Sequence, residues 1–379
     1  MTLAEVCEFG GGGIQTGPFG SQLHARDYVL EGIPSIMPQN IGDNRVVPDG
    51  IARISADDAT RLSRYLVKPG DIVYSRRGDV EKRALIRESE DGWLCGTGCL
   101  RVRLGEGGPD PVYASYYLGH PVVRAWVVRH AHGATMPNLN TTILGSLPFV
   151  VPPKRAQEAI ASVLGALDDK IELNRRMNET LEGLVRAVFV ERFLGVDHRP
   201  LWATGRLSDI LTLRYGKALP KRRHVPGDVP VYGSGGIYGY HDTALVNHPT
   251  VIVGRKGTVG SLRWESKPCH PADTVFYVEP TAPLTYCYYL LQTLGLEAMN
   301  TDAAVPGLNR ENAYRLEVPV PSPGALAEFD TFARPIRQRI DLGGAERDTL
   351  AGIRDALLPK LISGELRVPD AERVVGEVV

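Results

Sequence analysis

Two stretches of the chain carry apolar residues at alternating spacings of three and four, which predicts helices with one buried stripe. The first stretch follows the proline-rich segment 147–154, and Asn174 and Asn178 occupy two of its seam positions. The second follows the similar segment 316–324, but Pro335, Gly343 and Gly344 interrupt it, so we expect this helix to be kinked or to start late. The stripe residues are Leu164, Leu167, Ile171 and Leu181 in the first helix, and Ile336, Ile340, Leu350 and Leu357 in the second.

The segments before these helices show short β-branched runs between glycines and prolines, which is typical of strands separated by turns. We expect strands at 71–74, 100–104, 250–253 and 274–278, and short helices at 56–65 and 112–118. The chain is therefore predicted to have four parts. They are a first β-rich domain at 1–153, a first helix at 154–196, a second β-rich domain at 197–323, and a second helix with a C-terminal tail at 324–379.

An internal repeat links the two halves. The motif MPNLN ends at Asn140 and VPGLN ends at Asn309, and the same offset (309 − 140 = 169) aligns Ile171 with Ile340. Upstream, the turn at 76–78 resembles the turn at 255–257. This period is far longer than that of a solenoid, so it indicates a duplicated domain. We predict an α+β fold in which two similar β-rich domains are joined by long helices that form an antiparallel coiled coil. The two halves of the chain would be related by an approximate two-fold axis.

Composition restricts the class of protein. The chain has 379 residues with 43 basic and 44 acidic side chains. Its net charge of −1 excludes a uniformly basic protein that coats nucleic acid. No apolar run approaches the roughly 18 residues of a membrane span, and the N-terminal segment lacks the pattern of a signal peptide, so we expect a cytoplasmic protein. The five cysteines lack framework spacing, which favours reduced thiols.

The motifs of several catalytic and metal sites are missing. The glycine cluster 10–13 does not give G-x-G-x-x-G, and Pro18 stands after Gly17 where a phosphate loop needs lysine. Cys95 and Cys99 have no second ligand pair at zinc spacing. The Pro152-Pro153 doublet lacks the asparagine and aromatic residue of an adenine methyltransferase motif. We therefore expect no catalytic residue, no metal and no cofactor in this chain.

Basic and amide side chains cluster in the glycine-rich loops. Arginine and lysine on phosphates, and arginine, asparagine and glutamine on base edges, are the usual DNA contacts. Ordinary solvated loops would have a similar composition, so this pattern alone leaves both interpretations open. The candidate DNA-binding residues are Gln15, Thr16, Ser21, Gln39, Asn40, Arg76 and Arg77 in the first domain, and Arg214, Lys217, Arg255 and Lys256 in the second.

Several segments resemble a known family. They are TGPFGS at 16–21, GIPSIMPQNI at 32–41, VKPGDIVYSRRG at 67–78, MPNLN at 136–140, the helix entry VPPKRAQEAIASVLGALDDKIELN at 151–174 and LLPKLISGELRV at 357–368. Together they resemble the specificity (S) subunit of type I restriction–modification systems. The resemblance covers essentially the whole chain, in the order recognition domain, helix, recognition domain, helix. The second recognition domain matches through the looser motifs YGKALP, VPVYGSGG and VGRKGTVG.

The resemblance implies a non-catalytic subunit that reads an asymmetric, bipartite sequence in double-stranded DNA, with one half read by each recognition domain. The helices would act as a spacer and dock two methyltransferase (M) subunits, to which up to two restriction (R) subunits attach in phage defence. S-adenosylmethionine and ATP would belong to those partners. Two alternatives remain open: a restriction–methylation enzyme fused to such domains, and a duplicated β-rich protein-interaction scaffold with no DNA role.

Overall fold

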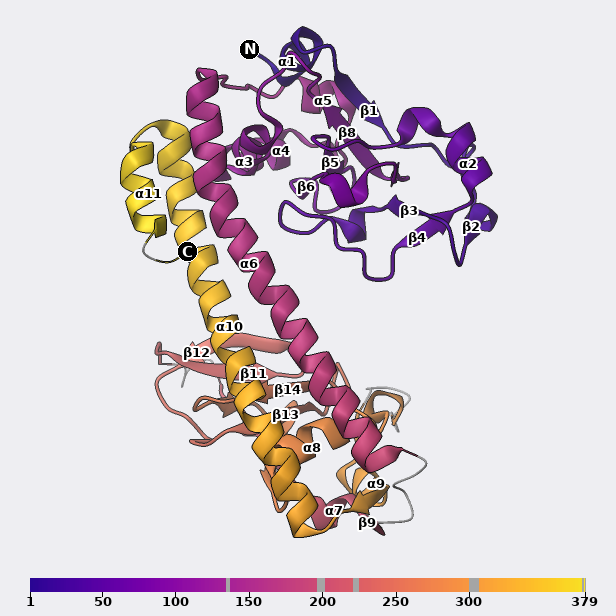
Figure 1. Ribbon diagram of the computed structural model, residues 1–379, viewed down its shortest axis with the longest axis vertical. Helices are drawn as coiled ribbons and strands as arrows, with labels where there is room; N and C mark the ends of the chain where they lie inside the picture. The colour runs from indigo at the N-terminus through magenta and orange to yellow at the C-terminus, as the bar shows by residue number, and fades with distance from the viewer. Residues whose placement is uncertain (134–136, 196–201, 221–224, 300–306, 377, 379) are drawn as a thin grey trace. The chain divides into compact units, whose positions relative to one another are not determined.

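The computed structural model describes residues 1–133, 137–195, 202–220, 225–299, 307–376 and 378, and Figure 1 labels many of its elements. The chain divides into two compact units, one of residues 1–172 with 348–379 and the other of residues 173–347. Each unit contains one β-rich domain and part of both long helices. The predicted boundary at 196–197 lies outside the described residues.

The first unit is built on a four-stranded antiparallel sheet of order β1-β8-β5-β6. A smaller sheet, β2-β4-β3-β7, pairs β3 and β7 in parallel. The strands are β1 (Gly13–Thr16), β2 (Tyr28–Val29), β3 (Ile33–Ile36), β4 (Ala52–Ile54), β5 (Ile72–Ser75), β6 (Arg83–Leu85), β7 (Leu94–Cys95) and β8 (Cys99–Arg103). The short helices are α1 (Leu3–Phe9), α2 (Ala56–Arg61), α3 (Pro111–Gly119), α4 (Pro121–His130) and α5 (Thr141–Gly145).

The second unit repeats this plan. Its main sheet has the order β10-β16-β13-β14 and is also antiparallel, and in the smaller sheet β12-β11-β15 the strands β11 and β15 are parallel. The strands are β9 (Ala203–Arg206), β10 (Leu211–Tyr215), β11 (Val229–Gly233), β12 (Gly236–His241), β13 (Thr250–Gly254), β14 (Leu262–Glu265), β15 (His270–Pro271), β16 (Val275–Pro280) and β17 (Glu317–Val320), which pairs with β9. The short helices are α7 (Leu207–Ile210), α8 (Leu284–Leu291) and α9 (Arg310–Tyr314).

The common strand order confirms the predicted duplication, and equivalent hydrogen bonds support it. Asn140 caps α5 by accepting a bond from the backbone of Ile143 at 2.7 Å, and Asn309 caps α9 by accepting one from Asn312 at 3.2 Å. These asparagines satisfy amides that the first turn of a helix leaves unpaired. The repeated motif that contains them is therefore a helix start in both domains.

The two long helices are α6 (Lys154–Phe189), which continues as a π-helical turn at Val190–Leu194, and α10 (Pro323–Ser363). The expectation that the second helix starts late is wrong, because α10 continues through Pro335, Gly343 and Gly344. Proline removes one backbone hydrogen bond, but packing of the apolar face supplies most of the stability of a helix in a protein. Phe329 and Ala333, which precede Pro335 by six and two residues, are almost fully buried in the core of the second unit.

Within each unit the stripes of α6 and α10 meet. Leu164 and Leu167 share a core with Leu350 and Leu357 in the first unit. In the second, Asn178 donates to the carbonyl of Ile340 at 3.0 Å, Arg337 pairs with Glu182, and Arg192 pairs with Glu328. Residues later in α6 contact residues earlier in α10, so the two helices are antiparallel, as predicted.

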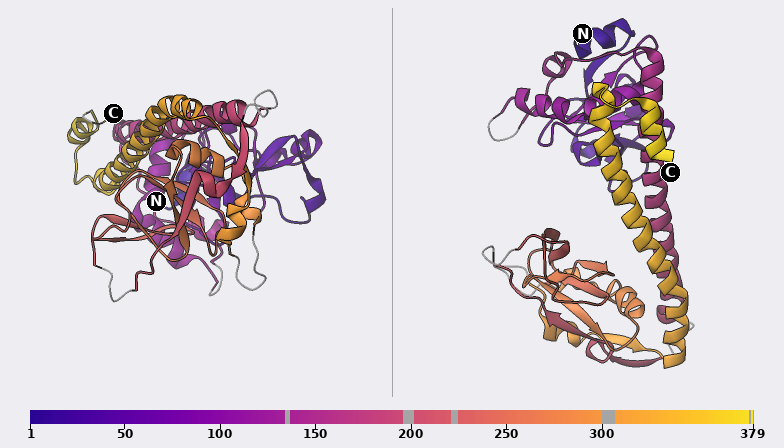
Figure 2. Two further views of the ribbon diagram at one scale, coloured as in Figure 1. Left: turned by 90° about the horizontal axis from the view of Figure 1, so that it is seen from below. Right: turned by 90° about the vertical axis from the view of Figure 1, so that its left-hand side faces the viewer.

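The C-terminal tail forms a helix that the sequence pattern did not predict. Gly364 takes a positive φ of 77°, and α11 (Val368–Gly376) follows it. Ala371 and Val375 of this helix are buried in the core that contains the ends of α6 and α10. Figure 2 shows α11 turned back beside the end of α10. Among the described residues, no helix is both long and apolar enough to cross a membrane.

Candidate nucleic-acid interface

The basic turn of the first domain lies directly after β5. The backbone amide of Arg76 donates to Gly98 at 2.8 Å, and its carbonyl accepts from the amide of Leu139, also at 2.8 Å. Gly78 then takes a φ of 73°, a conformation that glycine adopts without strain. These bonds connect the end of a central strand to the segment before α5 and leave the Arg77 side chain exposed.

The basic turn of the second domain has the same frame. The amide of Arg255 donates to Thr274 at 3.0 Å, its carbonyl accepts from Leu308 at 2.8 Å, and Gly257 has a φ of 83°. Lys256, at the position equivalent to that of Arg77, is also exposed. The structure therefore places the two predicted basic pairs at equivalent positions of the two domains.

Aromatic rings hold the first arginine of each turn. The guanidinium carbon of Arg76 lies 5.6 Å from the ring centre of Phe19. That of Arg255 lies 5.3 Å from the ring centre of Tyr215, and its Nη2 donates to the carbonyl of Asp273 at 2.6 Å. Stacking on a ring and bonding to a fixed carbonyl restrict the arginine side chain. These arginines are oriented by the fold, whereas Arg77 and Lys256 are exposed to solvent.

A tightly packed glycine lies close in sequence to the ring of each cluster: Gly17 precedes Phe19, and Gly216 follows Tyr215. The amide of Gly17 donates to Cys99 at 2.9 Å, and the amide of Gly216 donates to Val275 at 3.2 Å. A Cβ atom at either glycine would lie 2.0 Å from a backbone oxygen, so a larger residue would displace the loop. The glycine-rich loop that the sequence indicated is therefore fixed beside the basic turn.

Sequence reasoning missed three residues of these clusters. Phe19 and Tyr215 are about half exposed, and Arg310 lies 5.1 Å over the ring of Tyr215. Phe19 belongs to the TGPFGS motif, and Arg310 directly follows the Asn309 cap, so the repeated motifs contained a signal for both.

The other candidates have varied surroundings. Gln15 in β1 accepts a bond from Arg101 at 2.7 Å, and Asn40 is buried and donates to the carbonyls of Val47 and Asp49. Arg214 on β10 pairs with Glu279 at 2.7 Å, which raises the pKa of this arginine. Those polar groups are used within the fold. Thr16 is half-buried at the end of β1, and Ser21, Gln39 and Lys217 are exposed.

The thiols are all buried. Burial raises the pKa of Cys95 to about 12 and that of Cys99 well above its usual value, so both stay protonated near neutral pH. Within the part of the chain that the structure describes, no group of three or more histidine, cysteine, aspartate or glutamate residues is arranged to hold a metal.

Comparison with known proteins gives matches to one family. The model of the type I restriction modification DNA specificity domain matches residues 1–183 and 201–325. The type I restriction enzyme MjaIX specificity subunit of Methanocaldococcus jannaschii is 25% identical over 394 residues, covering 91% of this chain and 89% of the relative. The HindI specificity subunit of Haemophilus influenzae is 25% identical over 213 residues, covering 54% and 45%.

A solved structure has the same fold. The S subunit of a type I restriction–modification system from M. genitalium matches with a TM-score of 0.58 and 21% identity, over 92% of each chain. The repeated β-rich domain and the paired long helices thus define a duplicated α+β protein. The chain belongs to the family of type I restriction modification DNA specificity domains, as the sequence motifs predicted. It is a specificity subunit, which recognises DNA and is not the catalyst.

Proposed function

We propose that this chain reads a bipartite, asymmetric sequence in double-stranded DNA, with each β-rich domain binding one half of the target through its basic turn. The observation that carries the proposal is the equivalence of the two turns. The same backbone bonds hold Arg76-Arg77-Gly78 and Arg255-Lys256-Gly257. The loops around them differ in sequence, so the two half-sites would differ as well.

The two basic side chains of each turn would have different roles in DNA binding. Arg77 and Lys256 are exposed and suit contact with phosphates, which fixes the position of a protein on the duplex. Arg76 and Arg255 are held against rings, which gives a guanidinium the defined orientation that reading a guanine edge requires. The exposed rings of Phe19 and Tyr215 lie next to these groups.

We further propose that the long helices bind two methyltransferase subunits, to which up to two restriction subunits attach. S-adenosylmethionine and ATP would bind those partners. The residues that pack α6 against α10 are buried or half-buried, so they do not form the free surface. Exposed apolar residues remain on the part of the helices in the second unit: Leu173, Leu184, Phe332 and Leu342. Apolar side chains of this kind on a polar helix surface favour a protein partner.

Methylome sequencing tests the target directly. A host carrying this chain together with its methyltransferase subunit should acquire methylation at a two-part sequence with an unspecified gap. A host carrying the methyltransferase subunit alone is the control and should lack that methylation. One continuous methylated sequence, or methylation that does not depend on this chain, would contradict the proposal.

A further inference from the structure

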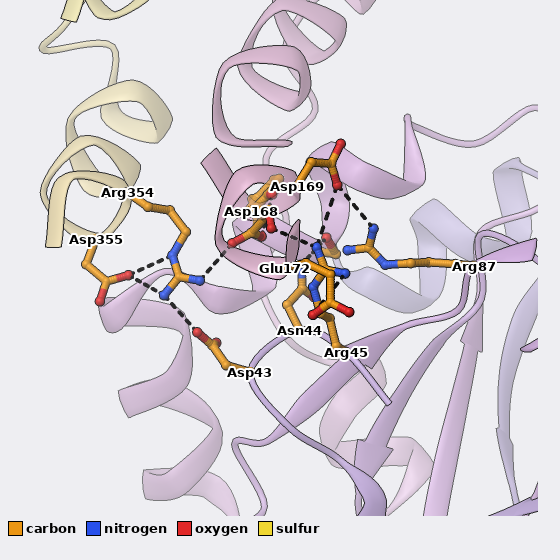
Figure 3. Close-up of polar contacts among 11 residues, drawn as sticks. Asp43, Asn44, Arg45, Arg87, Asp168, Asp169, Glu172, Arg354 and Asp355 are labelled. Atoms are coloured by element: carbon orange, nitrogen blue, oxygen red, sulfur yellow. Dashed lines mark hydrogen bonds and ion pairs between the residues drawn. The ribbon is translucent and has the colours of Figure 1, made fainter. Parts of the chain in front are cut away.

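Each unit contains an ion pair that joins α6 to α10 at the surface of its β-rich domain. In the first unit, Nη1 of Arg354 lies 2.8 Å from Oδ1 of Asp168, and the side chains are only 13% and 5% exposed. Figure 3 shows Arg354 between Asp168 and Asp43, which it meets at 2.7 Å. Tyr116 of α3 donates to the other oxygen of Asp168 at 2.6 Å. These contacts compensate both charges of the pair.

The second unit has a corresponding pair. Nη1 of Arg337 lies 2.6 Å from Oε2 of Glu182, with side chains 10% and 28% exposed. Tyr289 of α8 donates to Glu182 at 3.3 Å. Tyr289 occupies the helix equivalent to that of Tyr116. A tyrosine of the β-rich domain therefore contacts the acidic member of the pair in both units.

The sign of the charge is reversed between the halves. The repeat offset of 169 makes Asp168 on α6 the counterpart of Arg337 on α10. Both acids, Asp168 and Glu182, lie on α6, and both bases, Arg337 and Arg354, lie on α10. The apolar stripes of the two helices match, but the charges at these positions are complementary.

This reversal has a consequence for pairing between copies of the chain. If a second α6 replaced α10, Asp168 of that copy would take the place of Arg337 and face the carboxylate of Glu182. If a second α10 replaced α6, Arg337 of that copy would take the place of Asp168 and face Arg354. A two-fold pairing would contain each such contact twice. Like charges held together at positions mostly removed from water are unfavourable.

We propose that these two ion pairs select the partner of each long helix, so that the first half of the chain pairs with the second half and not with the same half of another copy. A duplicated protein needs such a device, because two similar apolar stripes also permit pairing of like with like. Polar and charged positions can then decide between pairings that the apolar seam does not distinguish.

The test reverses one charge on each helix of the full chain. In Glu182→Arg/Arg354→Glu, both pairs within the chain become like-charged, whereas the pairs between two copies become oppositely charged. Asp168→Arg/Arg337→Glu does the same from the other two positions. With all four substitutions combined, the pairs within the chain are oppositely charged again. Native mass spectrometry and co-purification of two differently tagged copies measure the fraction of dimer, and circular dichroism checks folding.

Each double variant should form at least ten times more dimer than the unmodified chain, and the fourfold variant should return to the unmodified level. The control, Glu158→Arg/Lys360→Glu, changes exposed charges on the same helices with the same net charge. It should behave like the unmodified chain. Folded double variants that do not dimerise, or a fourfold variant that remains dimeric, would overturn the proposal. If neither double variant folds while the fourfold variant does, the charges maintain pairing without selecting a partner, which also overturns it.

Discussion

Arg77 and Lys256 differ from the arginines beside them in how the fold uses their side chains. Arg76 and Arg255 are packed against aromatic rings, and Arg255 also bonds to a carbonyl, whereas the side chains of Arg77 and Lys256 are exposed. An exposed charge that only neutralises a phosphate contributes to affinity without choosing a base. The two kinds of residue should therefore respond differently to substitution.

Replacing Arg77 and Lys256 by alanine should weaken DNA binding about equally for all sequences and lower the slope of log affinity against log salt by about two. Replacing Arg76 and Arg255 should reduce discrimination at one base pair in each half-site by roughly 1–3 kcal/mol. Fluorescence anisotropy of the assembled complex over a salt series measures both. Lys154→Ala, which removes an exposed charge at the start of α6, is the control. Unchanged affinity and sequence preference in both double variants would refute the assignment.

Two adjacent glycines of α10 differ in their surroundings. A Cβ atom on Gly343 would lie 2.6 Å from the side-chain oxygen of Asn178, whereas a Cβ on Gly344 would meet nothing within 4 Å. Asn178 also donates to Ile340 at 3.0 Å, so a side chain at 343 would disturb a hydrogen bond between the helices. The close approach at Gly343 explains one interruption of the second stripe.

Gly344→Ala should raise the free energy of unfolding by about 0.5–1 kcal/mol, because alanine favours the helix and no neighbour opposes it. For Gly343→Ala the increase in the free energy of unfolding should be smaller by about 1 kcal/mol, because the new methyl group displaces Asn178 from its hydrogen bond with Ile340. Urea unfolding of the two variants side by side measures the difference. Equal stabilisation by both substitutions would show that the Asn178 contact has no energetic weight.

At the scale of elements, the long helices can be lengthened without changing their seam. Seven residues inserted after Met177, and seven at the corresponding position after Glu346, preserve the alternating spacing of the stripe. They lengthen the helix pair by about 10 Å. The ion pairs of Asp168 and Glu182 lie on either side of the insertion and keep their partners. This change therefore alters the length of the helix pair without altering how the two helices pair.

We expect the insertion variant to methylate the same two half-sites with a gap about three base pairs longer, at roughly 3.4 Å per base pair. Neither β-rich domain is altered, so the bases read should not change. Methylome sequencing gives the gap directly, even where rotation of the half-sites around the duplex reduces activity. An unchanged gap in an active variant would show that these helices do not set the spacing.

At the scale of the whole molecule, assembly should depend on apolar residues that the fold leaves exposed. Leu184 and Leu342 are 47% and 66% exposed on α6 and α10. Covering two such side chains with a partner contributes roughly 1.5–3 kcal/mol each. Their exposure in the single chain also favours self-association when the methyltransferase subunit is absent.

Replacing Leu184 and Leu342 by serine should weaken binding of the methyltransferase subunit at least tenfold while the helical content stays unchanged. Native mass spectrometry of mixtures at several concentrations measures the complex. Val150→Ser removes a similarly exposed apolar side chain just before α6 and should have little effect. Full assembly of the double variant would place the partner surface elsewhere.

The sequence by itself determined the plan of the molecule. The central strands of each main sheet and the helical stripes depend on local preferences and on periodicity, which a single sequence displays. The capping role of Asn140 and Asn309 was recognised only in the structure. The offset of 169 revealed the duplication because each half retained its motifs, and the same motifs indicated the family. Pro335 misled the prediction of the second helix, because tertiary packing outweighed a local preference.

Only the tertiary structure decided what individual polar residues do. It showed that Asn40 fixes a loop, that Arg255 lies on Tyr215, and that α11 completes the first core. It also brought Asp43, Asp168 and Arg354 together from three distant segments. Neither periodicity nor motif contains such contacts, because their energy depends on the distance and burial of groups far apart in the chain. The opposite charges of α6 and α10 were present in the sequence, but only the structure showed which acid pairs with which arginine.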